Sequence, residues 1–112
     1  MPIGIEIESQ LKIMLQEFRE ALESLYGDRF IQLILYGSHA RHEATEDSDI
    51  DVMVVLRGTV SPATEILRMG KIKTDLNLKY DELLSVVPIS EVDFQQKITP
   101  FTENVRREGI AV

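Results

Sequence analysis

Two short apolar segments, Leu33–Tyr36 and Val52–Leu56, constrain the fold of this chain more than any other feature. Both are short, apolar and rich in branched side chains, which predicts buried strands. Gly37-Ser38 follows the first segment, and Asp49-Ile50-Asp51 opens the second after the ten residues His39–Ser48. The pattern therefore predicts two neighbouring strands joined by a compact polar connection.

Asp49 and Asp51 project from the same face of the second strand, because successive side chains of a strand alternate. Neighbouring carboxylates repel one another, and a hard cation such as Mg2+, which binds carboxylates and substrate phosphates, removes the conflict. Gly37 lets the backbone approach a ligand closely, and Ser38 offers a hydroxyl and a helix N-cap that attracts phosphate. The alternatives are an ordinary strand-to-helix turn at Gly37-Ser38 and an exposed strand end at the two aspartates.

Helical spacing of apolar residues over Glu8–Tyr26 predicts a helix that covers one face of a sheet. The further elements we expect are a strand over Phe30–Tyr36, a short helix over His39–Glu43, a strand over Asp49–Leu56, a helix from Pro62 to about Leu78, a strand over Tyr80–Ile89, and two short helices, over Glu91–Ile98 and from Pro100 to Arg107. Residues 1–7 are expected to form an irregular or extended lead-in, and Ile110–Val112 a short apolar tail. The first two strands should pair antiparallel and the second and third parallel, through a crossover helix.

Composition narrows the kinds of partner. A chain of 112 residues is expected to form one domain, and its net charge of −7 argues against nucleic acid, which requires a basic surface. The absence of cysteine excludes disulfides and cysteine metal sites. No apolar segment approaches the about 20 residues that span a bilayer, and the N-terminus lacks a secretory pattern, so we expect a cytoplasmic protein.

The spacing of Gly37-Ser38, ten residues, and Asp49-x-Asp51 resembles the minimal branch of the DNA polymerase β-like nucleotidyltransferase superfamily. Arg41 and Ser48 also fit the GSxAR…SDID wording of that branch. The resemblance implies an α/β (α+β) fold, in which a small mixed sheet of three to four strands is flanked by helices. It also implies that ATP is the substrate and that two Mg2+ ions are bound, with Gly37 and Ser38 holding the β- and γ-phosphates.

A third carboxylate completes the site of this superfamily at the start of the next strand, and Asp81 occupies that place in the expected topology. Asp81 lacks the flanking signature of the family and could instead be a turn residue; Asp75 and Asp93 are weaker candidates because both lie in helical patterns. Arg41 could reach a triphosphate oxygen or be a solvated surface residue. His39 and His42 have no partner at metal-ligand spacing and are interpreted as surface residues.

The resemblance further implies a partner, a small helical HEPN ribonuclease toxin, to which the nucleotidyltransferase acts as antitoxin by transferring AMP from ATP to a tyrosine. The acidic chain is compatible with docking on a basic ribonuclease. Two alternatives stay open, namely nucleotidyl transfer to a small molecule and a non-catalytic module that binds a toxin.

Overall fold

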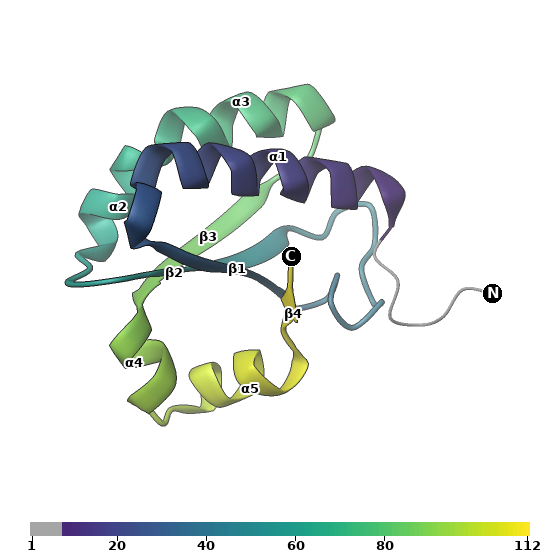
Figure 1. Ribbon diagram of the computed structural model, residues 1–112. Helices are drawn as coiled ribbons and strands as arrows, with labels where there is room; N and C mark the ends of the chain where they lie inside the picture. Colours follow the sequence, from purple (N-terminus) through teal and green to yellow (C-terminus); the bar gives the residue numbers. More distant parts are fainter. Residues whose placement is uncertain (1–7) are drawn as a thin grey trace.

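The computed structural model describes residues 8–112 and shows a four-stranded mixed sheet with helices on both faces (Figure 1). Its elements, in chain order, are α1 Ser9–Tyr26, the 3-10 helix η1 Gly27–Arg29, β1 Phe30–Tyr36, β2 Ile50–Leu56, α2 Pro62–Arg68, α3 Gly70–Tyr80, β3 Leu84–Ser90, α4 Glu91–Gln96, α5 Pro100–Glu108 and β4 Ile110–Ala111. This is the fold class predicted from the sequence. The predicted lead-in over residues 1–7 lies outside the described residues.

The strands lie in the order β3-β2-β1-β4. β1 and β2 pair antiparallel with Tyr36 opposite Asp51, and β2 and β3 pair parallel with Asp51 opposite Ser85. Both predicted pairings are confirmed. Because the end of β1 and the start of β2 lie at the same edge of the sheet, Gly37-Ser38 and the two aspartates come together there.

The main core lies between the sheet and α1, α2 and α3, which cover one face of it (Figure 1). The residues of α1 that are buried there recur every three or four positions: Leu11, Met14, Leu15, Phe18, Leu22 and Tyr26. The Glu8 carboxylate begins the helix by accepting from the amides of Gln10 and Leu11 at 3.0 and 2.9 Å. α4 and α5 lie over the opposite face, where Val105 packs on Ile34, Met53 and Val55.

One buried carboxylate joins the end of α1 to α2. Glu65 is 3% exposed, and the Tyr26 hydroxyl donates to its Oε1 atom at 2.7 Å. Arg29 and Arg68 lie 3.6 and 3.2 Å from the same carboxylate. A buried charge is tolerated where it is paired and hydrogen-bonded in this way, so Glu65 can link the end of α1 to α2 within the core.

The predicted helix over His39–Glu43 is wrong. The residues from Ser38 to His42 form successive turns, in which the Gly37 carbonyl accepts from both Ala40 and Arg41 at 3.1 Å. His42 has φ of 59°, the left-handed conformation, which ends any helical path after four residues. The connection therefore folds back on itself instead of leaving the sheet as a helix.

Other predicted elements also differ, and the second strand begins at Ile50, one residue after its predicted start at Asp49. The single helix from Pro62 to Leu78 is two helices, α2 and α3, which meet at Met69. The strand predicted from Tyr80 begins only at Leu84, because Asp81 adopts φ of 53° and ends α3 with its amide donating to the Asn77 carbonyl. The apolar tail is the edge strand β4, with Ala111 opposite Ile34 in β1.

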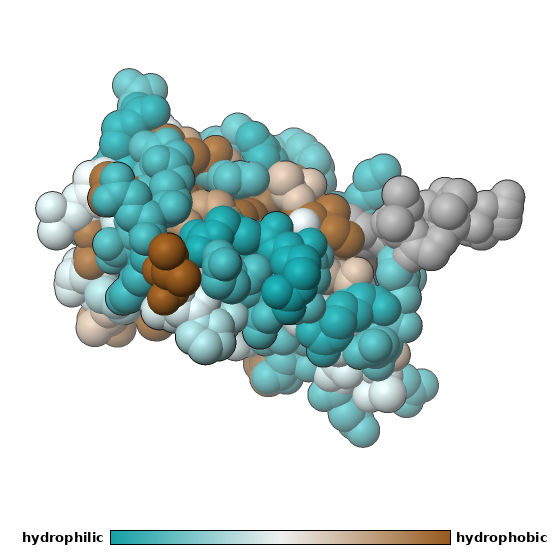
Figure 2. Space-filling model, turned by 90° about the horizontal axis from the view of Figure 1, so that it is seen from below, coloured by the Kyte–Doolittle hydropathy of each residue, from teal (hydrophilic) through white to brown (hydrophobic). Residues whose placement is uncertain are grey.

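The surface on the side of α4 and α5 is mainly hydrophilic with isolated hydrophobic residues (Figure 2). Within residues 91–108, which include α4 and α5, the exposed large hydrophobic residues are Val92, Ile98 and Phe101. Among residues 8–112, no helix combines the length and apolar character that crossing a membrane would require.

Candidate active site

Gly37 brings the backbone after β1 directly against the carboxylate of Asp51. It has φ of 76°, and a Cβ atom added there would overlap Asp51 Oδ2 and lie 3.2 Å from Asp51 Cβ. Any other residue would therefore strain the backbone and displace the carboxylate. The predicted juxtaposition of Gly37-Ser38 with Asp51 is present in the structure.

The turns after Gly37 leave amide groups available at the same edge. The amides of Ala40 and Arg41 donate back to the Gly37 carbonyl, and the amide of Glu43 donates to the Ser38 carbonyl at 2.9 Å. None of the backbone hydrogen bonds among residues 8–112 uses the amide of Ser38 or His39 as donor. Successive free amides beside a glycine turn form a concavity that binds anions such as phosphate.

The two aspartates differ in exposure. Asp49 is exposed in the loop just before β2, and Asp51 is half-buried as the second residue of that strand. Burial raises the pKa of Asp51, and repulsion from Asp49 raises it further, while His39 and Arg41 act in the opposite direction. Burial, and then the charge of Asp51, also raise the pKa of Tyr36 to about 12. The site therefore concentrates negative charge that a cation would neutralise.

The donor set fits Mg2+. Asp49 lines an open, acidic pocket of about 270 Å³ whose other lining residues are Glu46, Asp47, Ser48, Asp81, Glu82 and Leu83. Among residues 8–112, no three His, Cys, Asp or Glu side chains converge closely enough to hold a metal on their own. Mg2+ suits such a site, because it is usually bound through one or two carboxylates and completes its shell with water and substrate phosphates.

Asp81 lies at the end of α3, three residues before β3, and not at the start of the strand as predicted. The parallel register places Ser85 opposite Asp51, whereas Asp81 lines the same pocket as Asp49. Its role as a third ligand stays a prediction. Of the weaker candidates, Asp75 is paired with Lys71 at 2.8 Å on the exposed side of α3, and Asp93 lies in the first turn of α4.

The loop after Ser38 carries three polar side chains with different environments. Arg41 is exposed, and its Nε and Nη1 atoms donate to Glu43 and Glu108, each at 2.9 Å. His42 is exposed, as predicted. His39 is half-buried, and its Nε2 atom is buried without a hydrogen-bond partner among residues 8–112, which corrects its interpretation as a surface residue.

Three residues of the site were not predicted from the sequence. Ser85 lies opposite Asp51, Tyr36 lies beside it on β1, and Glu108 holds Arg41 from the end of α5. Tyr36 is the last residue of the predicted strand, so its nearness to Asp51 could have been inferred from the antiparallel pairing. Ser85 depends on the register of β3, and Glu108 on how α5 folds back toward β1, for which the sequence carries no local signal.

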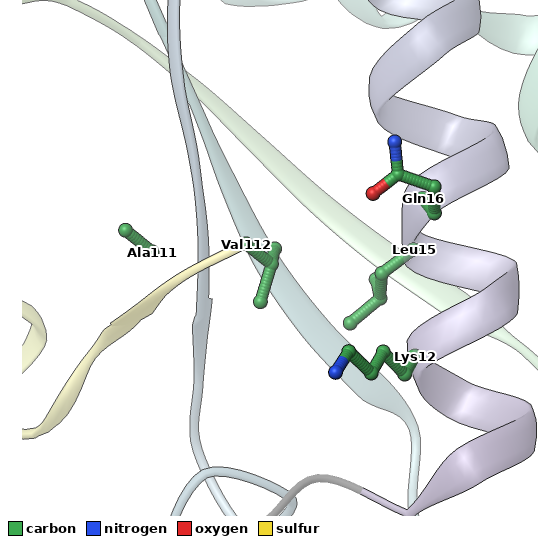
Figure 3. Close-up of a pocket in the computed structure, with 5 residues that line it drawn as sticks. All are labelled: Lys12, Leu15, Gln16, Ala111 and Val112. Atoms are coloured by element: carbon green, nitrogen blue, oxygen red, sulfur yellow. The ribbon is translucent and has the colours of Figure 1, made fainter.

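A second hollow lies elsewhere on the molecule, between α1 and the C-terminal edge strand. Figure 3 shows Lys12, Leu15 and Gln16 on the side of α1 that faces Val112, and it shows Ala111 farther from the helix than Val112. Within residues 8–112, no Asp or Glu side chain and none of the predicted site residues lines it.

Comparison with known proteins identifies relatives of this site and fold. Residues 15–109 match the family described as "Nucleotidyltransferase domain". A protein of Methanocaldococcus jannaschii that is named as a protein adenylyltransferase is 40% identical over 96 residues, which are 85% of this chain and 90% of the relative.

Two solved structures share the fold. A crystal structure of a toxin–antitoxin complex with AMP-PNP superposes with a TM-score of 0.60 and 17% identity, covering 86% of this chain and 70% of that one. A complex of a tri-AMPylated Shewanella oneidensis HEPN toxin with its MNT antitoxin superposes with a TM-score of 0.52 and 14% identity, covering 88% and 70%. The similarity inferred from Gly37-Ser38 and Asp49-x-Asp51 is confirmed.

Proposed function

This chain belongs to the nucleotidyltransferase domain family, and we propose that it transfers AMP from ATP to a hydroxyl group of a partner protein in an Mg2+-dependent reaction. The observation that carries the proposal is the closeness of Gly37 to Asp51, where an added Cβ atom would overlap the carboxylate. It supports a reaction that needs a turn suited to phosphate next to a carboxylate suited to Mg2+. Such a site suits phosphoryl transfer, because positioning of the phosphates and electrostatic stabilisation account for most of the catalysis of this reaction.

Each residue of the site has a role in this reaction. The Ser38 hydroxyl and the free amides of Ser38 and His39 would bind the β- and γ-phosphates, and Arg41 would contact a further phosphate oxygen. Asp49 and Asp51 would hold Mg2+, with two ions expected, and the metal supplies charge neutralisation and Lewis-acid polarisation when bound.

The acceptor would enter from the open acidic pocket that Asp49 and Asp81 share. Its oxygen forms a bond to the α-phosphorus, the bond from that phosphorus to the bridging oxygen of the β-phosphate breaks, and pyrophosphate leaves. Asp81, proposed as the third carboxylate, would help to take the proton of the acceptor hydroxyl.

We propose a small helical toxin of the HEPN class as the acceptor, modified on a tyrosine, so that the transfer makes this chain an antitoxin. The proposal is supported by the name of the archaeal relative and by the two toxin–antitoxin complexes that share the fold. The net charge of −7 favours encounter with a basic ribonuclease. We expect the reaction in the cytoplasm, where ATP and Mg2+ are abundant.

Intact mass spectrometry tests the proposal. The purified chain is mixed with ATP, Mg2+ and the product of the neighbouring gene, and the partner is expected to gain one or more AMP units. Asp51→Asn should abolish the gain, whereas Asp28→Asn, the same substitution in η1 at the other end of the sheet, should leave it unchanged. A stable complex without any AMP gain would instead support a non-catalytic binding module, and the absence of both would direct the search to small-molecule acceptors.

A further inference from the structure

Helix α5 touches the candidate active site at both of its ends. Near its start, the Phe101 ring packs edge-on against Tyr36 with 5.5 Å between the ring centroids, and Tyr36 lies opposite Asp51. Its last residue, Glu108, accepts from Arg41 Nη1 at 2.9 Å. The helix therefore connects the end of β1, which lies beside Asp51, to the loop that carries the arginine.

Glu108 is held more firmly than an ordinary surface carboxylate. Its side chain is 23% exposed, compared with 65% for Glu43, the other partner of Arg41. The next residue is Gly109, whose amide donates to the Val105 carbonyl at 2.8 Å, and a Cβ atom there would overlap Ile34 and the Val105 carbonyl. β4 then pairs with β1 directly after it, so the backbone on both sides of Glu108 is fixed.

The two carboxylates hold only part of the guanidinium. Glu43 accepts from Nε and Glu108 from Nη1, whereas an arginine presents five N–H groups in a rigid fork. The groups that remain can still donate to a phosphate. The Arg41 amide also donates to the Gly37 carbonyl at 3.1 Å, and Gly37 lies directly against the Asp51 carboxylate. The backbone that carries the held guanidinium is therefore part of the same turn that is proposed to bind the nucleotide.

We propose that Glu108 is a positioning residue that orients the Arg41 guanidinium toward the phosphates of the bound nucleotide. The inference rests on the proposed function, because it requires a triphosphate at Gly37-Ser38. An arginine that is already oriented loses less rotational freedom when its ligand binds, which improves affinity without a new contact. A carboxylate that shares its charge with a guanidinium also repels phosphate less than a free carboxylate does.

Calorimetric titration of the chain with ATP and Mg2+, without any acceptor, tests the inference. Glu108→Ala should raise the Kd for ATP by up to about fivefold, the upper end of the range expected for loss of one partly exposed charged contact. Glu108→Gln should have a smaller effect, because its amide oxygen still accepts from Nη1. Glu103→Ala is the matched control, since it removes an ion pair of the same helix, with Arg106 at 2.6 Å, that does not involve Arg41.

A double-mutant cycle separates positioning from general damage. In the Arg41→Ala background, Glu108→Ala should cause no further loss of ATP affinity, and neither substitution should weaken the binding of adenosine, which has no phosphates. Unchanged or tighter ATP binding by Glu108→Ala, or an equal loss in both backgrounds, would overturn the inference. If the wild-type chain binds no ATP at all, the proposed function is wrong as well, so the two failures are distinguishable.

Discussion

Gly37 occupies a position where any side chain would collide with the Asp51 carboxylate. Gly58 provides a matched comparison, since its φ of 86° is as unfavourable for alanine but nothing lies within 4 Å of a Cβ atom there. Gly58→Ala is therefore expected to cost only the backbone term of about 1–2 kcal/mol in the free energy of unfolding. Gly37→Ala should cost more and should also reduce AMP transfer at least about tenfold, because it displaces Asp51.

Urea denaturation and the transfer assay check this pair of variants together. The outcome that would contradict the geometry is equal behaviour of the two variants in both measurements. A loss of activity in Gly37→Ala with the same stability loss as Gly58→Ala would still place the glycine in the site, because displacement of a carboxylate affects metal binding more directly than folding.

Asp51 lies where its negative charge lowers the free energy of unfolding but suits the proposed binding of a metal ion. Its raised pKa means that the folded state disfavours the charged carboxylate, through burial first and the charge of Asp49 second. Asp51→Asn removes both penalties, so the free energy of unfolding without metal should rise near neutral pH, by up to about 1 kcal/mol. Because the folded-state pKa is raised, protonated Asp51 favours the folded state. This contribution to the free energy of unfolding is fully present below the pKa of a free aspartate and is lost as the pH rises through the folded-state pKa.

The advantage of Asp51→Asn over the wild type should therefore shrink as the pH falls. Denaturant unfolding without metal, near neutral pH and again below the ordinary pKa of an aspartate, measures it. A variant that is less stable than the wild type at neutral pH would show that the carboxylate is stabilised by contacts other than those described.

The residues proposed to carry the chemistry are the part of the candidate site most accessible from the sequence. Gly37, Ser38, Asp49 and Asp51 occur at a fixed spacing around two strands, and the strands follow from apolar runs. Their closeness needs only an antiparallel pair with a short connection. Glu108, by contrast, reaches Arg41 across 67 positions of the chain, and no local pattern predicts such a contact.

At the scale of elements, the end of α3 decides where Asp81, the predicted third carboxylate, lies. Asp81 takes the left-handed conformation usually left to glycine or asparagine, so the helix ends without a sequence signal and β3 begins four residues later than predicted. The β-branched run of β3 was recognised, but its first residue was not. The pairing of the first three strands was predictable because a short connection and a helical crossover each allow few arrangements, whereas the pairing of β4 with β1 was not predicted.

Asp81→Asn tests the third carboxylate without disturbing the helix end, because asparagine tolerates the left-handed conformation at least as well as aspartate. If Asp81 binds a metal or takes the proton of the acceptor, AMP transfer should fall about hundredfold or more at unchanged thermal stability. Glu82→Gln is the control, because Glu82 lines the same pocket and has no assigned role. Equal rates for the two variants would remove Asp81 from the site and leave two carboxylates to bind the metal.

At the scale of the whole molecule, one face of the sheet carries most of the core, and the other carries a helix that contacts the candidate active site. α1, α2 and α3 bury most of the core on one face, and Glu65 ties two of them together. The opposite face carries the smaller cluster under α4 and α5, and α5 reaches the active site from there. Nucleotide binding at Gly37-Ser38 would therefore link β1, β2 and α5 and should stabilise the fold as a unit.

This linkage predicts that Asp51→Asn raises the Tm of the chain without ligand but removes the rise in Tm that ATP and Mg2+ cause. A ligand at about 100 times its Kd adds about 2.7 kcal/mol to the free energy of unfolding. For a domain of about 100 residues, each kcal/mol raises the Tm by about 4–8 °C, so the expected rise is roughly 10 to 20 °C. ATP with Mg2+ should produce such a shift in the wild type, and EDTA should reduce it. Asp51→Asn should start from a higher Tm without ligand and show little or no shift with ATP and Mg2+. An equal shift in the variant, measured by thermal denaturation at the same ligand concentration, would mean that the nucleotide binds without the carboxylate on which the proposed mechanism depends.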